Sequence, residues 1–342
     1  MIEIFNYESI KQVPQEWDSI VGDNIYMTTQ FLSFMEDVDD CHQRYYALYK
    51  DGQLDTVFMT YERKRYNLGM FTKINLYQDM TFVYVPLSVT CPGIVYNQCL
   101  QQALDYIKKM KGPKILLNLE DMDLKGFAKG LTCPKCIFTN RFSSFEDYLG
   151  SLRSNYRRRY KQALKKSQDL TLTYLENNAD FTEEMYNCYL QVYNKSRVKI
   201  EKLPISFFRG DIFKIFTLSK EDKVVGFCQL LENGSELIFE FVGVDYAYNA
   251  QYDVYHRILL EIVRYGIENG FKTIDFGQTA DESKLKLGSK YTYLYAYLHH
   301  SNWVKNKINQ LLGKFLSYKY LTTKFDVFKG ENGNDESAAG SA

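Results

Sequence analysis

The sequence lacks a net charge, because its 42 lysines and arginines are balanced by 42 aspartates and glutamates over 342 residues. No overall field therefore attracts the protein to polyanions such as DNA, and any electrostatic recognition must be local. The sequence also lacks an apolar run that approaches the ~18 residues of a membrane span. No basic leader with an apolar core stands at Met1. These absences predict a cytoplasmic protein without a transmembrane segment.

The cysteine pattern of a disulfide-stabilised or zinc-binding protein is missing too. The seven cysteines are odd in number and scattered, which is typical of reduced thiols in a cytoplasm. The one close pair, Cys133 and Cys136, has no second pair at ligand spacing, so we expect no metal site. No Gly-x-Gly-x-x-Gly sequence follows a strand pattern, which disfavours a doubly wound dinucleotide-binding fold.

The same succession of patterns occurs twice in the sequence: a hairpin, then an amphipathic helix, then an apolar strand. The hairpin turns are predicted at Asp51–Gly52 and Asn233–Gly234. The length suggests two domains of about 150 residues each. We therefore expect an α/β fold of two modules, each a mixed, mostly antiparallel sheet flanked by helices, at residues 1–150 and 151–330. The small, polar residues 331–342 are expected to be disordered.

A basic segment opens the second half of the chain. Residues 151–166 hold seven lysines or arginines and no acid. On a helix, four of them recur at four-residue intervals and form one cationic stripe, namely Arg153, Arg157, Lys161 and Lys165. Because these like charges repel one another, we expect an anionic partner to compensate them. The alternative is a solvated helix face without a partner.

A second stretch, IDFGQTADESKLKLG, places polar residues where a strand ends. Asp275 and Gly277 close the strand at its carboxyl end, where the ligand sites of α/β proteins lie. Lys284 follows on a short polar turn. The alternative is a plain strand-to-helix turn in which Asp275 caps the helix.

These segments resemble the FemAB-like branch of the GNAT acyltransferase superfamily. The strand that ends in Asp-Phe-Gly, followed by a lysine and a glycine, is similar to the signature of that branch. SLRSNYRRRYKQALKKS resembles the basic helix that opens its second module, and NAQYDVYHRILLEIVRYGIENG resembles its long helix. The resemblance covers residues 20–300 and implies two GNAT-like modules in tandem, with a substrate cleft between them.

The resemblance also implies an activity. It points to an N-acyltransferase or aminoacyltransferase that moves an acyl group from an activated donor, acyl-CoA or aminoacyl-tRNA, to a small or cell-wall-related amine, without a tightly bound cofactor. Many GNAT enzymes carry their general base on the strand that here contains Glu240. Aromatic neighbours would desolvate that carboxylate and make it a better proton acceptor, unless strand alternation turns it toward solvent. The implied catalytic residues are Glu240, Asp275 and Lys284, and the implied substrate- or phosphate-binding residues are Arg153, Arg157, Lys161, Tyr252 and Gly277.

Because of one departure from the GNAT pattern, both acyl-CoA and aminoacyl-tRNA stay possible as donors. GNAT enzymes bind the pyrophosphate of CoA on a glycine-containing loop at a helix N-terminus. The corresponding segment, VDYAYNAQYDVYHR, has no glycine between Asp245 and the helix. A rival hypothesis is a non-catalytic RNA- or tRNA-binding protein that uses the helix over residues 153–166.

A third hypothesis concerns residues 303–320. A helix there would have an apolar face and lysines off it, formed respectively by Val304, Ile308, Leu311 and Phe315, and by Lys305, Lys307 and Lys314. Such a helix packs more often on its own domain than on a membrane surface, so packing is the preferred expectation and peripheral membrane contact the alternative.

Overall fold

The structure is a computed structural model, and it describes residues 1–38, 41–69, 75–196, 202–313, 317–321 and 323–330. The chain folds into two compact units. The first comprises Met1–Lys135, Ser196–Ile212 and Thr292–Tyr320, and the second comprises Cys136–Lys195, Phe213–Tyr291 and Leu321–Ala342.

The first unit is built on an eight-stranded sheet with the order β1-β2-β3-β4-β6-β15-β7, and β5 pairs with β3. The strands are β1 (Ile2–Tyr7), β2 (Arg44–Lys50), β3 (Gln53–Asn67), β4 (Tyr77–Val83), β5 (Ile94–Tyr96), β6 (Pro113–Leu119), β7 (Ala128–Leu131) and β15 (Tyr295–His300). The α-helices are α1 (Trp17–Val21), α2 (Thr29–Val38), α3 (Leu100–Lys109), α7 (Ile205–Phe208) and α11 (Trp303–Leu312), with 3₁₀ turns η1 (Ile10–Gln12) and η2 (Ile25–Met27).

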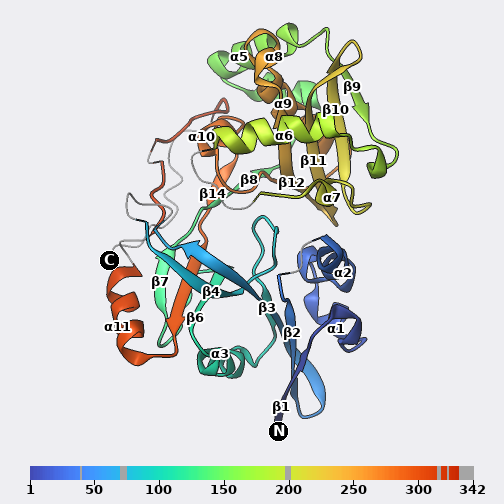
Figure 1. Ribbon diagram of the computed structural model, residues 1–342. Helices are drawn as coiled ribbons and strands as arrows, with labels where there is room; N and C mark the ends of the chain where they lie inside the picture. The colour runs from blue at the N-terminus through green and yellow to red at the C-terminus, as the bar shows by residue number, and fades with distance from the viewer. Residues whose placement is uncertain (39–40, 70–74, 197–201, 314–316, 322, 331–342) are drawn as a thin grey trace. The chain divides into compact units, whose positions relative to one another are not determined.

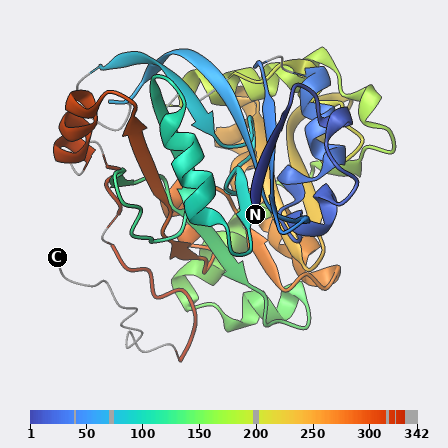
Figure 2. The ribbon, with the colours of Figure 1, turned by 90° about the horizontal axis from the view of Figure 1, so that it is seen from below.

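Helix α3 lies across the sheet of this unit (Figure 2). Its residues Ala103, Leu104 and Ile107 are buried against Phe58 of β3 and Leu116 of β6. The apolar positions recur at helical spacing, so the helix buries one continuous stripe.

The second unit is built on a seven-stranded sheet with the order β14-β8-β13-β12-β11-β10-β9. The strands are β8 (Lys135–Thr139), β9 (Thr171–Tyr174), β10 (Lys214–Lys220), β11 (Lys223–Asn233), β12 (Glu236–Val244), β13 (Thr273–Asp275) and β14 (Lys290–Thr292). The α-helices are α4 (Phe145–Ser151), α5 (Ser154–Lys166), α6 (Glu183–Lys195), α8 (Tyr246–Tyr252), α9 (Val254–Glu268) and α10 (Asp281–Leu285), with the 3₁₀ turn η3 (Asn178–Asp180).

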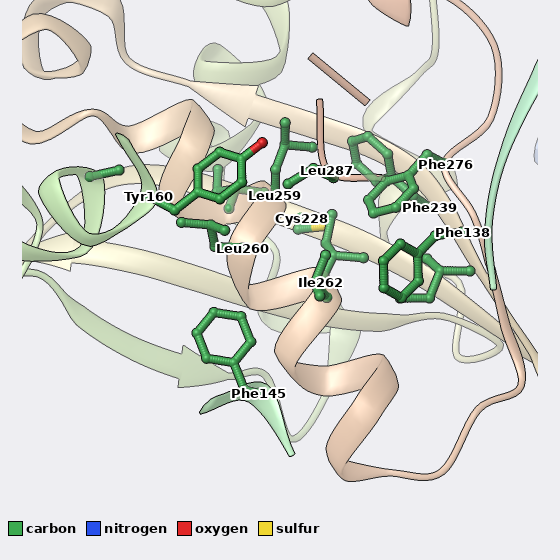
Figure 3. Packing of buried hydrophobic residues seen from close by; sticks show 14 of the residues in the cluster. Phe138, Phe145, Tyr160, Cys228, Phe239, Leu259, Leu260, Ile262, Phe276 and Leu287 are labelled. Carbon is green, nitrogen blue, oxygen red and sulfur yellow. The ribbon is translucent and has the colours of Figure 1, made fainter. Parts of the chain in front are cut away.

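Helices α9 and α6 cover opposite faces of this sheet (Figure 1). On the α9 side, Ile262 and Leu259 pack with Phe239 and Phe138 in the core of the unit (Figure 3). Gly266 lets α9 approach β13, because a Cβ at this position would lie 2.5 Å from the Cδ1 atom of Ile274. The close packing of α9 therefore fixes the position of β13.

The predicted fold class is confirmed: each unit is a mixed sheet of mostly antiparallel strands flanked by helices. Both predicted hairpin turns are present. Asp51 and Gly52 have φ angles of 51° and 81°, and Gly234 has a φ of 56°. This left-handed region of φ is the one that tight hairpin turns require.

The boundaries of the compact units differ from the predicted ones at residues 150 and 151. Strand β8 and helix α4 precede the predicted boundary but belong to the second unit, where Phe138 and Tyr148 join the core. Strand β15 lies within the predicted second module but pairs with β6 and β7 of the first compact unit. Strand pairing between distant segments thus decides the division. The predicted tail, 331–342, lies outside the described residues.

Candidate active site

The candidate site lies where strands β12 and β13 separate. These two strands are parallel, and they pair only through Glu236–Ile238 and Thr273–Asp275. Strand β12 continues to Val244, so its edge beyond Ile238 has no strand partner on the β13 side among the described residues. The carboxyl ends of parallel strands are the usual place for ligands in α/β sheets.

Glu240 lies directly on this edge and is only 6% exposed. It occupies a β-bulge, because Gln229 and Leu230 of β11 pair with Phe241 and Phe239 and leave Glu240 between them. The prediction that this carboxylate is desolvated is confirmed, and the alternative that strand alternation turns it toward solvent is wrong. Bulges are frequent beside active sites, where they re-aim a side chain.

Gln229, beside the bulge on β11, is a polar residue that the sequence analysis missed. It is 0% exposed, and neither its Oε1 nor its Nε2 atom has a hydrogen-bond partner among the described residues. A buried polar group in this state costs about 1–3 kcal/mol, and such groups mark places where water or a ligand binds. The available signal was a single glutamine inside the apolar run VVGFCQLL.

The turn after β13 is held by its own polar groups. The backbone N–H of Gly277 donates to the carboxylate of Asp275 at 2.7 Å, and both residues are buried. Gly277 has a φ of 67°, and Thr279 and Ala280 follow with φ angles of 64° and 51°. Two successive non-glycine residues in the left-handed region store strain of about 1–3 kcal/mol each, which is found mostly at functional sites.

Lys284 of α10 closes the same turn. Its Nζ atom donates to the carbonyl of Gln278 at 2.7 Å and lies 5.7 Å from the ring centre of Phe239. Its side chain is only 3% exposed. Burial raises the pKa of the nearby Cys136 thiol to about 12, in spite of the opposing charge of Lys284. Cys136 is therefore no nucleophile at neutral pH.

The basic helix forms as predicted: α5 begins at Ser154 and buries Tyr160 and Ala163. Its N-terminus opens on a pocket of about 740 Å³ in the second unit. The pocket contains three cations and one carboxylate, a net charge of +2, and is lined by Arg153, Ser154, Asn155, Tyr156, Arg157, Asp326, Lys329 and Gly330. The Arg157 guanidinium and the Lys329 ammonium both donate to the carbonyl of Gly150, at 3.3 and 2.6 Å.

Arg159, on another face of α5, is compensated inside the protein. It forms an ion pair with Asp253, whose other carboxylate oxygen lies 2.9 Å from Nδ1 of His256. Burial alone would raise the pKa of Asp253, but the hydrogen bonds from His256 and Arg159 outweigh it and hold this pKa well below its usual range. An ionised carboxylate therefore stands at the start of α9.

A second side chain of the protein also occupies the start of α9. The side chain of Asn249 in α8 accepts a hydrogen bond of 2.9 Å from the backbone N–H of Tyr255. A single residue, Asp253, links α8 to α9, with a φ of 54°. A helix N-terminus of this kind is an anion-binding site, and the resemblance to GNAT enzymes implies that a CoA pyrophosphate would bind here. In this protein, the first turn of α9 is occupied by Asp253 and by the side chain of Asn249.

The predicted site residues fall into two places in the second unit. Glu240, Asp275, Gly277 and Lys284 lie around the end of β13, whereas Arg153 and Arg157 lie in the α5 pocket. Lys284 does not line that pocket. Lys161 is exposed farther along α5, and Tyr252 is buried at the end of α8 with its ring centre 6.2 Å from that of Tyr248.

The two places are joined by a hydrogen bond between their elements. The hydroxyl of Tyr160 in α5 donates to the carbonyl of Lys286, just after α10, at 2.6 Å. A displacement of α5 would therefore also displace the segment that carries Lys284.

Comparisons with known proteins agree with this geometry. Residues 150–285 match the sequence model of the acetyltransferase (GNAT) domain family. No curated protein sequence matches the chain. Among solved structures, FemX is 12% identical with a TM-score of 0.54 and covers 90% of this chain and 100% of its own.

Two further structures share the fold. L-PGS from Bacillus licheniformis is 11% identical with a TM-score of 0.50, over 82% of this chain and 93% of its own. A conserved protein of unknown function from Bacteroides thetaiotaomicron VPI-5482 is 13% identical with a TM-score of 0.52, over 87% of this chain and 100% of its own. Residues 150–285 therefore match the GNAT domain family, and the chain as a whole shares the fold of FemX, to which it is similar in structure.

Proposed function

We propose that the chain transfers an aminoacyl group from aminoacyl-tRNA to the amine of an acceptor, at the place where β12 and β13 separate. The observation that carries this proposal is the position of Glu240, a buried carboxylate on a bulge directly beyond the end of β13.

Glu240 acts as the general base. The acceptor nitrogen attacks the carbonyl carbon of the acyl group, a new C–N bond forms, and the ester bond to the ribose oxygen of the donor breaks. The attacking nitrogen loses a proton to the Glu240 carboxylate, and the ribose oxygen leaves as a hydroxyl after taking up a proton. A desolvated carboxylate is suited to this step because it accepts a proton more readily than one in water.

The backbone of β12 beyond Ile238 supplies the remaining requirement. Acyl transfer passes through a tetrahedral oxyanion that needs hydrogen-bond donors. The β12 edge beyond Ile238 borders the site on the β13 side, and its backbone N–H groups are the donors we assign. Asp275 and Lys284 act as positioning residues, because their hydrogen bonds to Gly277 and Gln278 hold the turn that borders this edge.

The start of α9 favours tRNA over CoA as the carrier of the acyl group. Asp253, paired with Arg159, and Asn249, which accepts the N–H group of Tyr255, fill the place that a pyrophosphate would take at this terminus. The α5 pocket, with its net charge of +2, is the phosphate-binding place we propose instead, through Arg153 and Arg157. The exposed Lys161 and Lys165 extend the same cationic stripe along α5 and fit a longer polyanion.

The test offers both donors to the full chain. Purified protein is mixed with radiolabelled aminoacyl-tRNA or with radiolabelled acetyl-CoA, and with a panel of small and cell-wall-related amines. We expect label to appear in an amide that survives mild base, which hydrolyses the ester of the donor, and only with the tRNA donor. Transfer from acetyl-CoA alone would refute the choice of donor, and no transfer from either would refute the proposal.

A further inference from the structure

Helix α11 is placed with its polar side toward its own unit. The Asn306 side chain donates to the carbonyl of Gly126 at 2.8 Å and accepts from the backbone N–H of His300 at 2.9 Å. Two turns farther on, Gly313 approaches β7 so closely that a Cβ there would lie 3.1 Å from the carbonyl oxygen of Lys129. Residues 306 and 313 are seven apart, so they lie on one side of the helix.

The opposite side is apolar and faces outward. No residue of α11 is buried, and Trp303 and Leu311 are 73% and 75% exposed. Val304, Ile308 and Leu312 are exposed as well. The preferred expectation, that this face packs on the chain's own domain, is therefore wrong for the described residues. Phe315 and Lys314, which the sequence also assigned to this helix, lie outside them.

An amphipathic helix in a folded protein normally has the reverse orientation, with the apolar stripe toward the core. Five exposed large apolar side chains in ten residues form a contiguous patch rather than scattered surface residues, and such patches mark interaction sites. In Figure 2, α11 is the red helix at the edge of the first unit, beside β15. This location leaves the apolar stripe available to a partner.

We propose that α11 docks the protein on an anionic phospholipid membrane. The helix contains no acidic residue; the exposed Lys305 lies at one border of the apolar stripe, and the exposed Lys307 lies between Trp303 and Leu311. Lysines beside an apolar face that includes a tryptophan are the combination that lies in the headgroup region of a bilayer. No described helix is long and apolar enough to span a membrane, so the contact is peripheral.

Charge and composition favour an anionic membrane over a second copy of the chain, or over its C-terminal residues, as the partner of α11. In a two-fold dimer through α11, the same patch would face itself and bring Lys305 and Lys307 near their own copies, which repel. The C-terminal residues 331–342 are small and polar in sequence, so they offer no apolar surface to cover the stripe. Anionic lipid complements both the apolar stripe and the lysines. The inference does not depend on the proposed donor or acceptor.

Vesicle flotation of the full chain tests the proposal. We expect the protein to float with vesicles of equimolar phosphatidylglycerol and phosphatidylcholine, and much less with phosphatidylcholine alone. The variant Trp303→Gln/Leu311→Gln should reduce the bound fraction about tenfold or more, because it removes buried apolar area. The variant Lys305→Gln/Lys307→Gln should abolish the preference for the anionic vesicles.

The matched control is Phe5→Gln/Tyr77→Gln, which removes two exposed aromatic residues from β1 and β4 of the same unit and should bind like the native chain. Absence of flotation in the native chain would overturn the proposal, as would equal flotation of the Trp303→Gln/Leu311→Gln variant. If the native chain fails to float and sediments as a dimer that this variant breaks, the occupant of the stripe is a second copy.

Discussion

Arg159 of α5 and Asp253 at the start of α9 form an ion pair, with a second contact of 3.3 Å between Nη2 and Oδ1. The pair joins the basic helix to the helix that supports β13. It also fills, with side chains of the protein itself, the helix terminus at which a CoA-binding GNAT domain needs to bind an anion. One contact thus bears on both the stability of the second unit and the donor that we propose for it.

The variant Asp253→Asn should lower the free energy of unfolding at neutral pH by about 1–2 kcal/mol, because Arg159 and His256 lose a charged acceptor. The pKa of Asp253 is depressed in the folded state. Its contribution is therefore complete above the unfolded pKa of about 4 and is lost as the pH falls below that value.

Urea unfolding at neutral pH and at about pH 3 measures this effect. The difference between the native chain and Asp253→Asn should shrink at the lower pH. The exposed Asp169→Asn should leave the free energy of unfolding unchanged. A difference that stays constant with pH would show that the ion pair contributes no linked stability.

Substitution of Lys284 by methionine should destabilise the turn after β13. The side chain keeps its length but loses the hydrogen bond to the carbonyl of Gln278, which costs about 1–3 kcal/mol. Because the turn borders the reaction site, kcat should fall while KM for the donor changes little.

The control is Lys286→Met, which removes a lysine two residues away that pairs with Glu282 on the surface. It should leave kcat and stability near native values. If Lys284→Arg restores the native kcat, the residue acts by holding the turn. If Lys284→Met raises KM for the acceptor with kcat unchanged, Lys284 binds substrate instead of holding the turn.

Charge reversal at Arg157 should weaken donor binding. Arg157→Glu changes the net charge of the α5 pocket from +2 to 0, so KM for the donor should rise and its dependence on salt should flatten. Arg158→Glu alters the total charge equally but lies outside the pocket. Equal effects of the two variants would mean that the pocket itself does not bind the donor.

The sequence predicted the local elements of the second unit well. The turn at Asn233–Gly234 and the basic helix with its cationic stripe depend on short-range patterns, and both are present. Strand partners depend on pairing between distant segments, which periodicity does not encode. For that reason β8 and β15 were assigned to the wrong halves of the chain.

The site was predictable in its residue types but not in their environments. The positions of Asp275 and Lys284 followed from the end of a strand, yet the charge of a lysine does not reveal that its ammonium is buried against a carbonyl. Gln229 escaped notice because a lone polar residue in an apolar strand resembles ordinary surface alternation. Periodicity likewise defined both faces of α11 without showing which one packs.

The central claim is that Glu240 removes the proton from the attacking amine. Single-turnover amide formation from aminoacyl-tRNA, measured against pH for the native chain, Glu240→Gln and the same-strand control Glu236→Gln, tests it most directly. We predict that Glu240→Gln slows the reaction about 10²–10⁴-fold and abolishes the acid limb of the profile, while Glu236→Gln behaves like the native chain. A Glu240→Gln variant that keeps the native rate and pH profile would contradict the account.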